Sequence, residues 1–520
     1  MPVGRHVIDM SGAAGKPGFD GGNWFTLSDD SGGDQIGIHI SSFGDHHAQV
    51  HRDFDGRIIA ALSGQGHSTG LSIAAGSQAE LSAVEFCYAP NADEMTRRFQ
   101  RYVRTEILPD REHWEPRKVH LNSWEALSFN LSGNGLMRLA DDAANLGIER
   151  LVLDDGWFKN RRNDRAGLGD WTVDEGIFPN GLTPLIDHVK SLGMDFGLWV
   201  EPEMISPDSD LYRAHPDWCL HDESDERPTE RNQLVLDLGR QEVWQYIADA
   251  LDALLRDNDI AYLKWDHNRR LFPDNGKQQQ AIHDLLQHMR AQWSDVEIEI
   301  CSSGGGRIST AYLRHCHRVW PSDNNDPIER LPIMQNWSRF LPLEILGNHV
   351  GPSPNPITGR QTAMDFRAKV AIFGHMGVEA NPADMSDAER GCLVAHIALY
   401  KEWRHILHSG EYVQLDHPDA GVFAHMVVGY DAALGLAAQT EFGKNFSAAP
   451  VCLKGLEPEA EYLVQLSKPW PKKASQYLAN PERWEKGLQL SGLALMQQGL
   501  ALPLTHPETA WLFTLQRIAS

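Results

Sequence analysis

Between residue 119 and about residue 380, short apolar runs alternate with amphipathic helical stretches, and this rhythm repeats eight times. We predict strands at 120–124, 151–155, 196–201, 260–266, 296–301, 317–323, 346–350 and 370–374. The apolar run 233–238 is left out as an excursion, because an amphipathic helix follows it before the fourth strand. Eight β-then-α units predict an α/β fold with a central (β/α)8 TIM barrel, whose functional residues lie at the carboxyl ends of the strands.

The regions on either side of this barrel read as mainly β-structure. Before it, the alternating run 36–40 and the runs 70–73 and 81–86 precede a predicted helix from about Asp93 to Ile107. After it, a helix with the capping box Ser386 to Glu389 runs to about His408. Four later runs, 412–415, 421–428, 434–438 and 462–466, indicate a C-terminal antiparallel β-sandwich domain. We therefore expect three domains: an N-terminal β-rich domain with its connecting helix (1–118), the catalytic barrel (119–410) and the C-terminal β domain (411–520).

The charge balance restricts the kind of partner this chain can bind. The formal net charge is -24, from 71 acidic and 47 basic residues, which argues against nucleic acid or an anionic membrane surface. No run approaches the ~18 apolar residues of a membrane helix, and the first residues lack the apolar core of a secretion signal. Six cysteines without a CxxC pair suit reduced thiols. We expect a cytoplasmic protein with a neutral small-molecule ligand.

Two aspartates, Asp266 and Asp323, stand at the ends of the predicted fourth and sixth strands. Two such carboxylates can cleave a glycosidic bond: one attacks the anomeric carbon or activates water, and the other protonates the departing oxygen. Either aspartate alone is equally well explained as a turn or helix-cap residue. The residues around each of them decide between these interpretations.

Lys264 lies two positions before Asp266 on the same predicted strand. Alternate residues of a strand face the same way, so both side chains would point into the barrel mouth. A cation beside Asp266 favours its ionised form, which a nucleophile requires, and an ammonium can donate to a sugar hydroxyl. A purely structural Lys–Asp pair at a loop remains the alternative.

A second pair of carboxylates, Asp154 and Asp155, follows the predicted second strand. Ionised carboxylates accept hydrogen bonds, so this pair suits two hydroxyls of a polyol, although an Asp-Gly turn explains it too. Three tryptophans at strand ends, Trp124, Trp157 and Trp199, offer indole faces for stacking on a pyranose. Taken singly, each tryptophan is better explained as part of the core.

The glycine-rich run 301–307 lacks the Gly-Lys-[Ser/Thr] ending of a phosphate loop, which leaves a close backbone approach to a ligand or a simple turn. Histidines cluster at His46, His47 and His51 and again at His315 and His317. No carboxylate stands at a recognisable ligand spacing from them, so we predict neither a metal site nor an organic cofactor.

Seven motifs occur in an order that resembles the α-galactosidases of glycoside hydrolase family 36. They are Asn-Ser-Trp-Glu-Ala (122–126), Leu-Asp-Asp-Gly-Trp-Phe (153–158), Gly-Leu-Trp-Val-Glu-Pro-Glu-Met (197–204), Arg-Asn-Gln-Leu-Val-Leu-Asp (231–237), Leu-Lys-Trp-Asp-His-Asn-Arg (263–269), Cys-Ser-Ser-Gly-Gly-Gly-Arg (301–307) and Trp-Pro-Ser-Asp-Asn-Asn-Asp-Pro-Ile-Glu-Arg (320–330). The resemblance is specific over residues 118–380. It implies that Asp266 is the nucleophile and Asp323 the acid/base. It further implies that Trp124, Asp154, Asp155, Trp199, Arg231 and Lys264 line the galactose subsite, with Cys301 and its loop near the 2-hydroxyl.

Three departures from the family pattern limit what the resemblance carries over. The segment before the barrel is far shorter than the large β-supersandwich of long family members, so their tetramer is not carried over and a homo-oligomer is left open. His267 replaces the common Met beside the nucleophile, and Ser303 replaces the usual glycine. Ser303 would approach the 2-substituent of the sugar.

We expect a retaining exo-α-galactosidase that acts on terminal α-linked galactose without a metal or organic cofactor. An α-N-acetylgalactosaminidase or a galactosyl transferase on the same scaffold is the nearest alternative, since the fold does not decide between them. A metal-dependent barrel hydrolase and a non-catalytic sugar-binding protein are the alternatives from other classes.

Overall fold

The computed structural model describes residues 2–29, 33–64, 75–76, 78, 82–109, 114–221, 227–271, 277–443, 445 and 448–518. The predicted run 70–73 lies outside these residues. The chain separates into two compact units. The first unit holds Met1–Glu112, Leu127–Ala140 and Leu151–Asp323, and the second holds His113–Ala126, Asp141–Arg150 and Asn324–Ser520.

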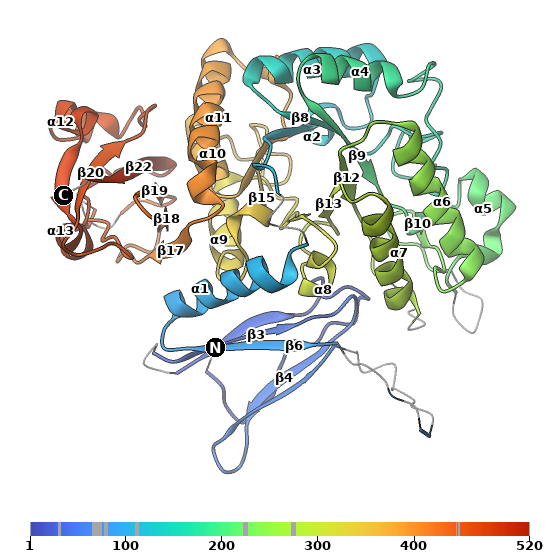
Figure 1. The fold of residues 1–520 in the computed structure, drawn as a ribbon, viewed down its shortest axis with the longest axis horizontal. Coiled ribbons are helices and arrows are strands. Elements are labelled where there is room, and N and C mark those ends of the chain that lie inside the picture. Colours follow the sequence, from blue (N-terminus) through green and yellow to red (C-terminus); the bar gives the residue numbers. More distant parts are fainter. Residues whose placement is uncertain are drawn as a thin grey trace. The chain divides into compact units, whose positions relative to one another are not determined.

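Eight short strands form one sheet in the order β14-β13-β12-β9-β8-β7-β16-β15, which confirms the predicted (β/α)8 barrel (Figure 1). The strands are β7 (His120–Asn122), β8 (Arg150–Leu153), β9 (Asp195–Val200), β12 (Tyr262–Trp265), β13 (Glu297–Ile300), β14 (Arg318–Val319), β15 (Gly347–Val350) and β16 (His375–Val378). Nearly all of their residues are buried. Parallel strands are covered on both faces, so they appear in the sequence as unbroken apolar runs.

The predicted position of the eighth strand is wrong. Residues 370–371 end helix α10 (Met364–Ala371), and the strand that follows is β16 (His375–Val378). The run Val370, Ala371, Ile372 and Phe373 is fully buried, which made it resemble a strand. A short apolar run does not by itself distinguish a buried helix end from a buried strand.

The remaining barrel helices are α2 (Trp124–Leu127), α3 (Gly133–Leu146), α4 (Thr183–Ser191), α6 (Gln241–Asp257), α7 (Gln278–Gln292), α8 (Thr310–Leu313), α9 (Pro327–Trp337) and α11 (Asp387–Leu407). Helix α6 buries Val243, Ile247, Leu251 and Leu254 on one face, as its periodicity predicts. The run 233–238, which we predicted not to be a barrel strand, forms β11 (Leu234–Val235). This strand pairs antiparallel with β10 (Met204–Ile205) near the short helix α5 (Asp210–Ala214), outside the barrel sheet, so the prediction is confirmed.

The described residues of the N-terminal region form two three-stranded sheets and a helix. One sheet has the order β1 (Ile8–Asp9), β4 (His47–Arg52), β5 (Ile58–Ser63), and the other β2 (Trp24–Ser28), β3 (Gln35–Ile40), β6 (Val84–Ala89). The predicted helix is confirmed as α1 (Ala92–Tyr102), which continues as one π-helical turn over Val103–Ile107. Phe99 of α1 packs so closely on Gly37 of β3 that a Cβ atom there would lie 2.4 Å from its ring.

The C-terminal region forms one six-stranded antiparallel sheet in the order β17 (Glu411–Leu415), β18 (Val422–Val428), β19 (Ala432–Gln439), β22 (Thr509–Arg517), β20 (Glu461–Leu466), β21 (Leu488–Ser491). Two short helices, α12 (Pro481–Lys486) and α13 (Gly492–Gln497), lie between its later strands. Its inward residues include Met426, Trp511 and Phe513. The predicted capping box begins α11, where the Ser386 hydroxyl accepts from the Glu389 N–H. The three-domain division at residues 118 and 410 stays a prediction.

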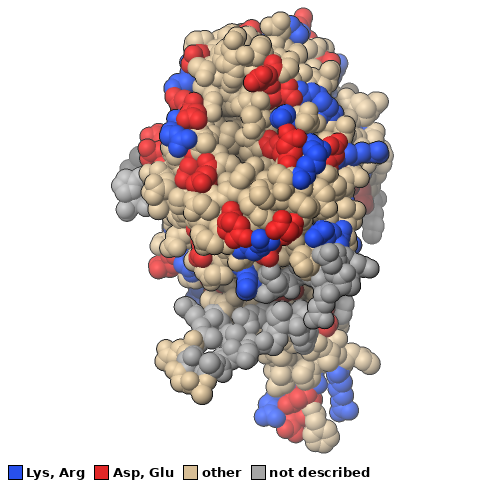
Figure 2. Space-filling view, turned by 90° about the vertical axis from the view of Figure 1, so that its right-hand side faces the viewer, with Lys and Arg blue, Asp and Glu red and all other residues tan. Residues whose placement is uncertain are grey.

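Acidic and basic side chains are interspersed on the face drawn in Figure 2. Exposed ion pairs of this kind include Arg213 with Asp208 and Arg240 with Glu242. Among the helices of the described residues, none combines the length and the apolar character needed to cross a membrane.

Candidate active site

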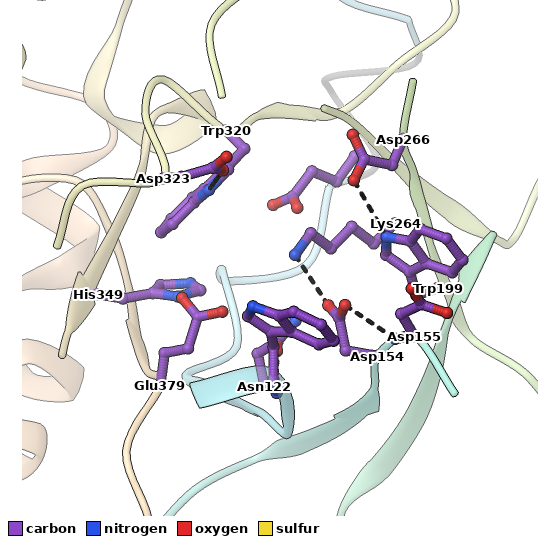
Figure 3. Close-up of polar contacts among 12 residues, drawn as sticks. Asn122, Asp154, Asp155, Trp199, Lys264, Asp266, Trp320, Asp323, His349 and Glu379 are labelled. Atoms are coloured by element: carbon purple, nitrogen blue, oxygen red, sulfur yellow. Dashed lines mark hydrogen bonds and ion pairs between the residues drawn. The ribbon is translucent and has the colours of Figure 1, made fainter. Parts of the chain in front are cut away.

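Asp266 directly follows β12 and is buried among hydrogen-bond donors (Figure 3). Its Oδ2 accepts from Asn268 Nδ2 at 2.6 Å and from Trp199 Nε1 at 3.3 Å, and its Oδ1 accepts from the His267 N–H at 2.8 Å. Burial opposes ionisation, but the charge of Lys264 and the bonds from Asn268 and His267 outweigh it and hold the pKa of Asp266 below its usual value. The carboxylate is therefore ionised and fixed in orientation.

Lys264 and Asp154 form a buried ion pair beside this carboxylate. Lys264 Nζ lies 2.8 Å from Asp154 Oδ2, so the ammonium bonds directly to Asp154 and acts on Asp266 through its charge. The other oxygen of Asp154 accepts from the N–H of Asp155 at 2.9 Å. These contacts fix the Asp154 carboxylate at the end of β8, as Figure 3 shows.

Asp155 is held by Arg161, a residue that the sequence did not single out. Arg161 Nε and Nη2 donate to the two carboxylate oxygens at 2.9 and 2.8 Å, in a fork-shaped pair that is almost fully buried. Burial raises the pKa of Asp155, while the Arg161 charge opposes that shift. The two neighbouring aspartates thus have different partners, an ammonium for Asp154 and a guanidinium for Asp155.

Trp199, on β9, is 2% exposed, and its indole N–H points at Asp266. Trp157 is fully buried, and its Nε1 donates to the carbonyl of Trp199 at 2.9 Å. Trp157 therefore supports Trp199 from behind and belongs to the core. Trp124 begins α2 in the second unit, where it is half-buried and its N–H donates to Asn122 Oδ1 at 2.8 Å.

Asp323 follows β14 and is exposed, and Figure 3 shows it across from Asp266 and Lys264. Trp320 Nε1 donates to its Oδ1 at 3.0 Å. The backbone before it is braced by Gly304, which has φ of +85° and approaches so closely that a Cβ atom would lie 2.8 Å from Ser322 Cα. The predicted close approach was to a ligand, whereas the approach that the structure shows is to the backbone before Asp323.

Cys301 starts this loop directly after β13, and its thiol is buried. Burial, followed by the charges of Asp266 and Asp323, raises the pKa of the Cys301 thiol well above its usual value. The thiol therefore stays neutral at neutral pH.

Ser303 and Arg231 are joined in a short chain of hydrogen bonds that ends at Asp266. Arg231 Nη1 lies 3.4 Å from Ser303 Oγ, which donates to Asn268 Oδ1 at 3.2 Å, while Asn268 Nδ2 donates to Asp266. Guanidinium groups only donate and carboxylates only accept, so the direction of the chain is fixed. Ser303 and Arg231 have φ of 46° and 52°, in the left-handed region where side chains cost free energy.

Two glutamates after β9 are the main residues that the sequence reasoning missed. Glu201 is fully buried and accepts from the Asn268 N–H at 2.5 Å; burial, followed by the charge of Asp266, raises its pKa to about 8. Glu203 receives a two-pronged pair from Arg307, with both distances 2.6 Å. The run Val-Glu-Pro-Glu at a strand end was a visible signal for both.

Two histidines of the predicted clusters lie beside backbone groups. His317 Nδ1 accepts from the Ile298 N–H at 3.0 Å, and His46 Nε2 lies 3.0 Å from the Met10 carbonyl. Elsewhere, Asp365, Cys392 and His396 bring three metal-type ligand atoms within 4.8 Å of one another. The Lys369 ammonium lies 2.8 Å from the Asp365 carboxylate and already supplies a positive charge there.

Comparison with known proteins places this geometry in a family. A model of the melibiase family matches residues 80–410, and a model of the glycosyl hydrolase family 36 C-terminal domain matches residues 422–515. The chain belongs to the melibiase family, in glycoside hydrolase family 36. Its motifs at the ends of β8, β9, β12, β13 and β14 all fall within the first of these matches.

Relatives within the family include an α-galactosidase of Escherichia coli, 40% identical over 443 residues, which cover 82% of this chain and 62% of that protein. The α-galactosidase AgaA of Geobacillus stearothermophilus is 35% identical over 387 residues, covering 71% of this chain and 53% of the relative. The chain thus spans less than two thirds of the length of these curated relatives.

Solved structures of family members agree with the fold over the whole chain. The galactosidase domain of the α-galactosidase–sucrose kinase AgaSK matches with a TM-score of 0.93 and 31% identity, covering 100% of this chain and 71% of that one. The crystal structure of AgaA from Geobacillus stearothermophilus matches with a TM-score of 0.91 and 29% identity, covering 100% and 72%.

Proposed function

We propose that this protein is a retaining exo-α-galactosidase that hydrolyses terminal α-linked galactose. The observation that carries the proposal is the ionised, buried Asp266, fixed by Asn268, Trp199 and the His267 N–H, with Asp323 across from it. The activity of the curated relatives supports the same assignment.

In the proposed first step, Asp266 attacks the anomeric carbon while the bond from that carbon to the leaving oxygen breaks. Asp323 gives its proton to the departing oxygen, and a covalent galactosyl-enzyme forms. In the second step Asp323 takes a proton from water, which attacks the anomeric carbon and releases Asp266. Two inversions leave galactose with its original α configuration.

We assign the galactose subsite to Trp124, Asp154, Asp155, Trp199, Arg231, Lys264, Cys301 and Ser303. The ion pair of Lys264 and Asp154 offers both a donor and an acceptor to the 4- and 6-hydroxyls. The two hydrogen bonds from Arg161 fix Asp155, and its carboxylate oxygens can each accept a further hydrogen bond from a sugar hydroxyl. Crystal structures of an AgaA variant with raffinose and of another with stachyose support an oligosaccharide substrate.

A screen of aryl α- and β-glycosides, followed by anomer-resolved NMR, tests this function. We expect turnover of α-galactosides with α-galactose as the first product, and far slower turnover of α-glucosides. The β anomer as first product would contradict the retaining mechanism. Preference for the N-acetylated sugar, galactosyl transfer as the main reaction, or loss of activity on chelation would each favour one of the alternative enzymes.

Changing Ser303 to Gly is expected to relax selectivity at the 2-position. A serine side chain fills space near C2 that glycine leaves open, so the wild-type enzyme should exclude an N-acetyl group. We expect the ratio of kcat/KM for aryl α-N-acetylgalactosaminides over aryl α-galactosides to rise about tenfold, the size of a small steric contact.

The matched control is Ser303→Ala, which keeps the Cβ atom and loses the hydroxyl. If bulk sets the selectivity, this variant retains the wild-type ratio, although it loses the hydroxyl's contacts with Asn268 and Arg231. An unchanged ratio in Ser303→Gly would mean that the side chain faces away from C2.

A carbohydrate is the partner that we propose, in keeping with the net charge of -24, which disfavours nucleic acid. Residence in the cytoplasm also stays a prediction, which the six free cysteines of the chain support. The oligomeric state is left open by the sequence, and sedimentation analysis of the purified chain decides it.

A further inference from the structure

A segment near the N-terminus, residues 14–24, is bonded to the loops that follow β12 and β13. The Leu271 N–H donates to the Ala14 carbonyl at 2.8 Å, the Gly18 N–H donates to the Gly306 carbonyl at 2.9 Å, and Asn23 Nδ2 donates to the Ile308 carbonyl at 3.0 Å. The segment lies outside the residues that either family model matches. It nevertheless contacts the two loops that begin with Asp266 and Cys301.

Lys16, in this segment, is fully buried, and its ammonium reaches the residue after the nucleophile. Lys16 Nζ donates to the His267 carbonyl at 3.2 Å, and Ser302 Oγ donates to the same oxygen at 2.7 Å. The N–H on the other side of that peptide bond, from Asn268, donates to Glu201. Both polar atoms of the peptide that links His267 to Asn268 are therefore fixed.

This peptide positions two of the donors that hold Asp266. The His267 N–H donates to Oδ1, and the side chain of Asn268 donates to Oδ2. A shift of the peptide would move both donors together. Lys16 is thus connected to the nucleophile through one rigid link, although 250 positions separate the two residues in the sequence.

The charge of Lys16 acts in the same direction as its hydrogen bond. Burial, followed by the charge of Arg307, lowers the pKa of Lys16 to about 7, while Asp266, Glu201 and Cys301 oppose that shift. Arg307 is itself paired with Glu203, and Lys16 Nζ also lies 3.9 Å from the centre of the Phe19 ring. In acid solution the amine is protonated, and its positive charge stabilises the negative charge of Asp266.

We propose that Lys16 is a positioning residue for the catalytic nucleophile, which holds the His267–Asn268 peptide and stabilises the charged form of Asp266. The inference rests on the proposed function. It assigns to the short N-terminal region a part in the chemistry of the barrel, which the family motifs do not include.

The test compares Lys16→Met with Lys16→Gln in the full-length protein, using the pH profile of kcat/KM on an aryl α-galactoside. Met removes both the charge and the donor, whereas Gln keeps a donor for the His267 carbonyl. Removing the cation should raise the pKa of Asp266, so the rate should begin to fall at a higher pH. We expect the acid limb to move up by about 0.5–1 unit in both variants, because an opposite charge nearby lowers a carboxyl pKa by ~1–3 units.

At neutral pH we expect kcat/KM per folded molecule to fall about tenfold in Lys16→Met and less in Lys16→Gln. Lys369→Met is the matched control, because Lys369 is also fully buried, with bonds to Asp365 and the Ala510 carbonyl. This control should lose stability and keep the wild-type acid limb. If Lys16→Met does not fold, Lys16→Gln decides the question through its acid limb.

An active, folded Lys16 variant with the wild-type acid limb would overturn the inference. An equal shift in Lys369→Met would do the same, because it would show a general effect of burying an uncharged side chain. Absence of α-galactoside turnover by the wild-type protein would instead overturn the proposed function, and this role with it.

Discussion

Asp266→Ala is expected to lower kcat/KM on α-galactosides by roughly 10³–10⁶-fold, the range found when a nucleophile is removed. No other carboxylate is held by the three donors that fix Asp266, so the covalent galactosyl-enzyme does not form. Azide should partly restore turnover, because it fits the space that the carboxylate leaves. Attack from that face yields the β-galactosyl azide, which NMR of the product identifies.

A matched control for this variant is Asp170→Ala. Asp170 is also buried, but its carboxylate accepts from the N–H groups of Asp210 and Leu211 at the start of α5. This change should reduce stability, and azide should not rescue it. An α-azide product, or full activity in Asp266→Ala, would remove Asp266 from the role of nucleophile.

Asp323→Ala is expected to reduce the rate much more for substrates with a poor leaving group than for substrates with a good one. A poor leaving group needs a proton in the transition state, whereas an acidic phenol departs without one. Melibiose-type substrates should slow by ~10²–10⁴-fold, the usual contribution of a general acid, and galactosides of acidic phenols much less in the first step. The basic limb of the pH profile of kcat/KM should disappear as well.

Trp320→Phe is the companion variant, since it removes the 3.0 Å bond to Asp323 and keeps the carboxyl group. This variant should shift the basic limb of the pH profile of kcat/KM. The ranking of substrates by their kcat/KM values should stay as in the wild type. Equal losses of Asp323→Ala on good and poor leaving groups, measured at pre-steady state, would count against the acid role.

Much of the barrel could be predicted because its strands are buried on both faces and stand out as apolar runs. The eighth strand was misplaced because the buried end of α10 has the same apolar character, and β22 (Thr509–Arg517) was missed although it is central in its sheet. Its apolar run of Ala, Trp, Leu and Phe was a visible strand signal, and only its place between β19 and β20 required the fold.

The position of the two aspartates that we propose for catalysis could be predicted because a barrel exposes its functional groups at the carboxyl ends of strands. The side chains that contact each aspartate could not be predicted from the sequence. Alternation along β12 places Lys264 on the side of Asp266, but only the fold brings its ammonium to Asp154. Arg161 and Lys16 were missed for the same reason, because their contacts join segments that no spacing rule connects.

Two neighbouring positions of the glycine-rich loop differ in whether they can carry a side chain. Position 303 tolerates a side chain, at the cost of a left-handed backbone, so it can be exchanged as substrates change. Position 304 cannot, because any side chain would collide with Ser322 and displace the backbone of Asp323. A change of preference at C2, the role that we propose for position 303, would therefore occur directly beside a position that accepts no side chain. A substitution at position 304 should lower activity on every substrate, because it displaces the backbone of Asp323.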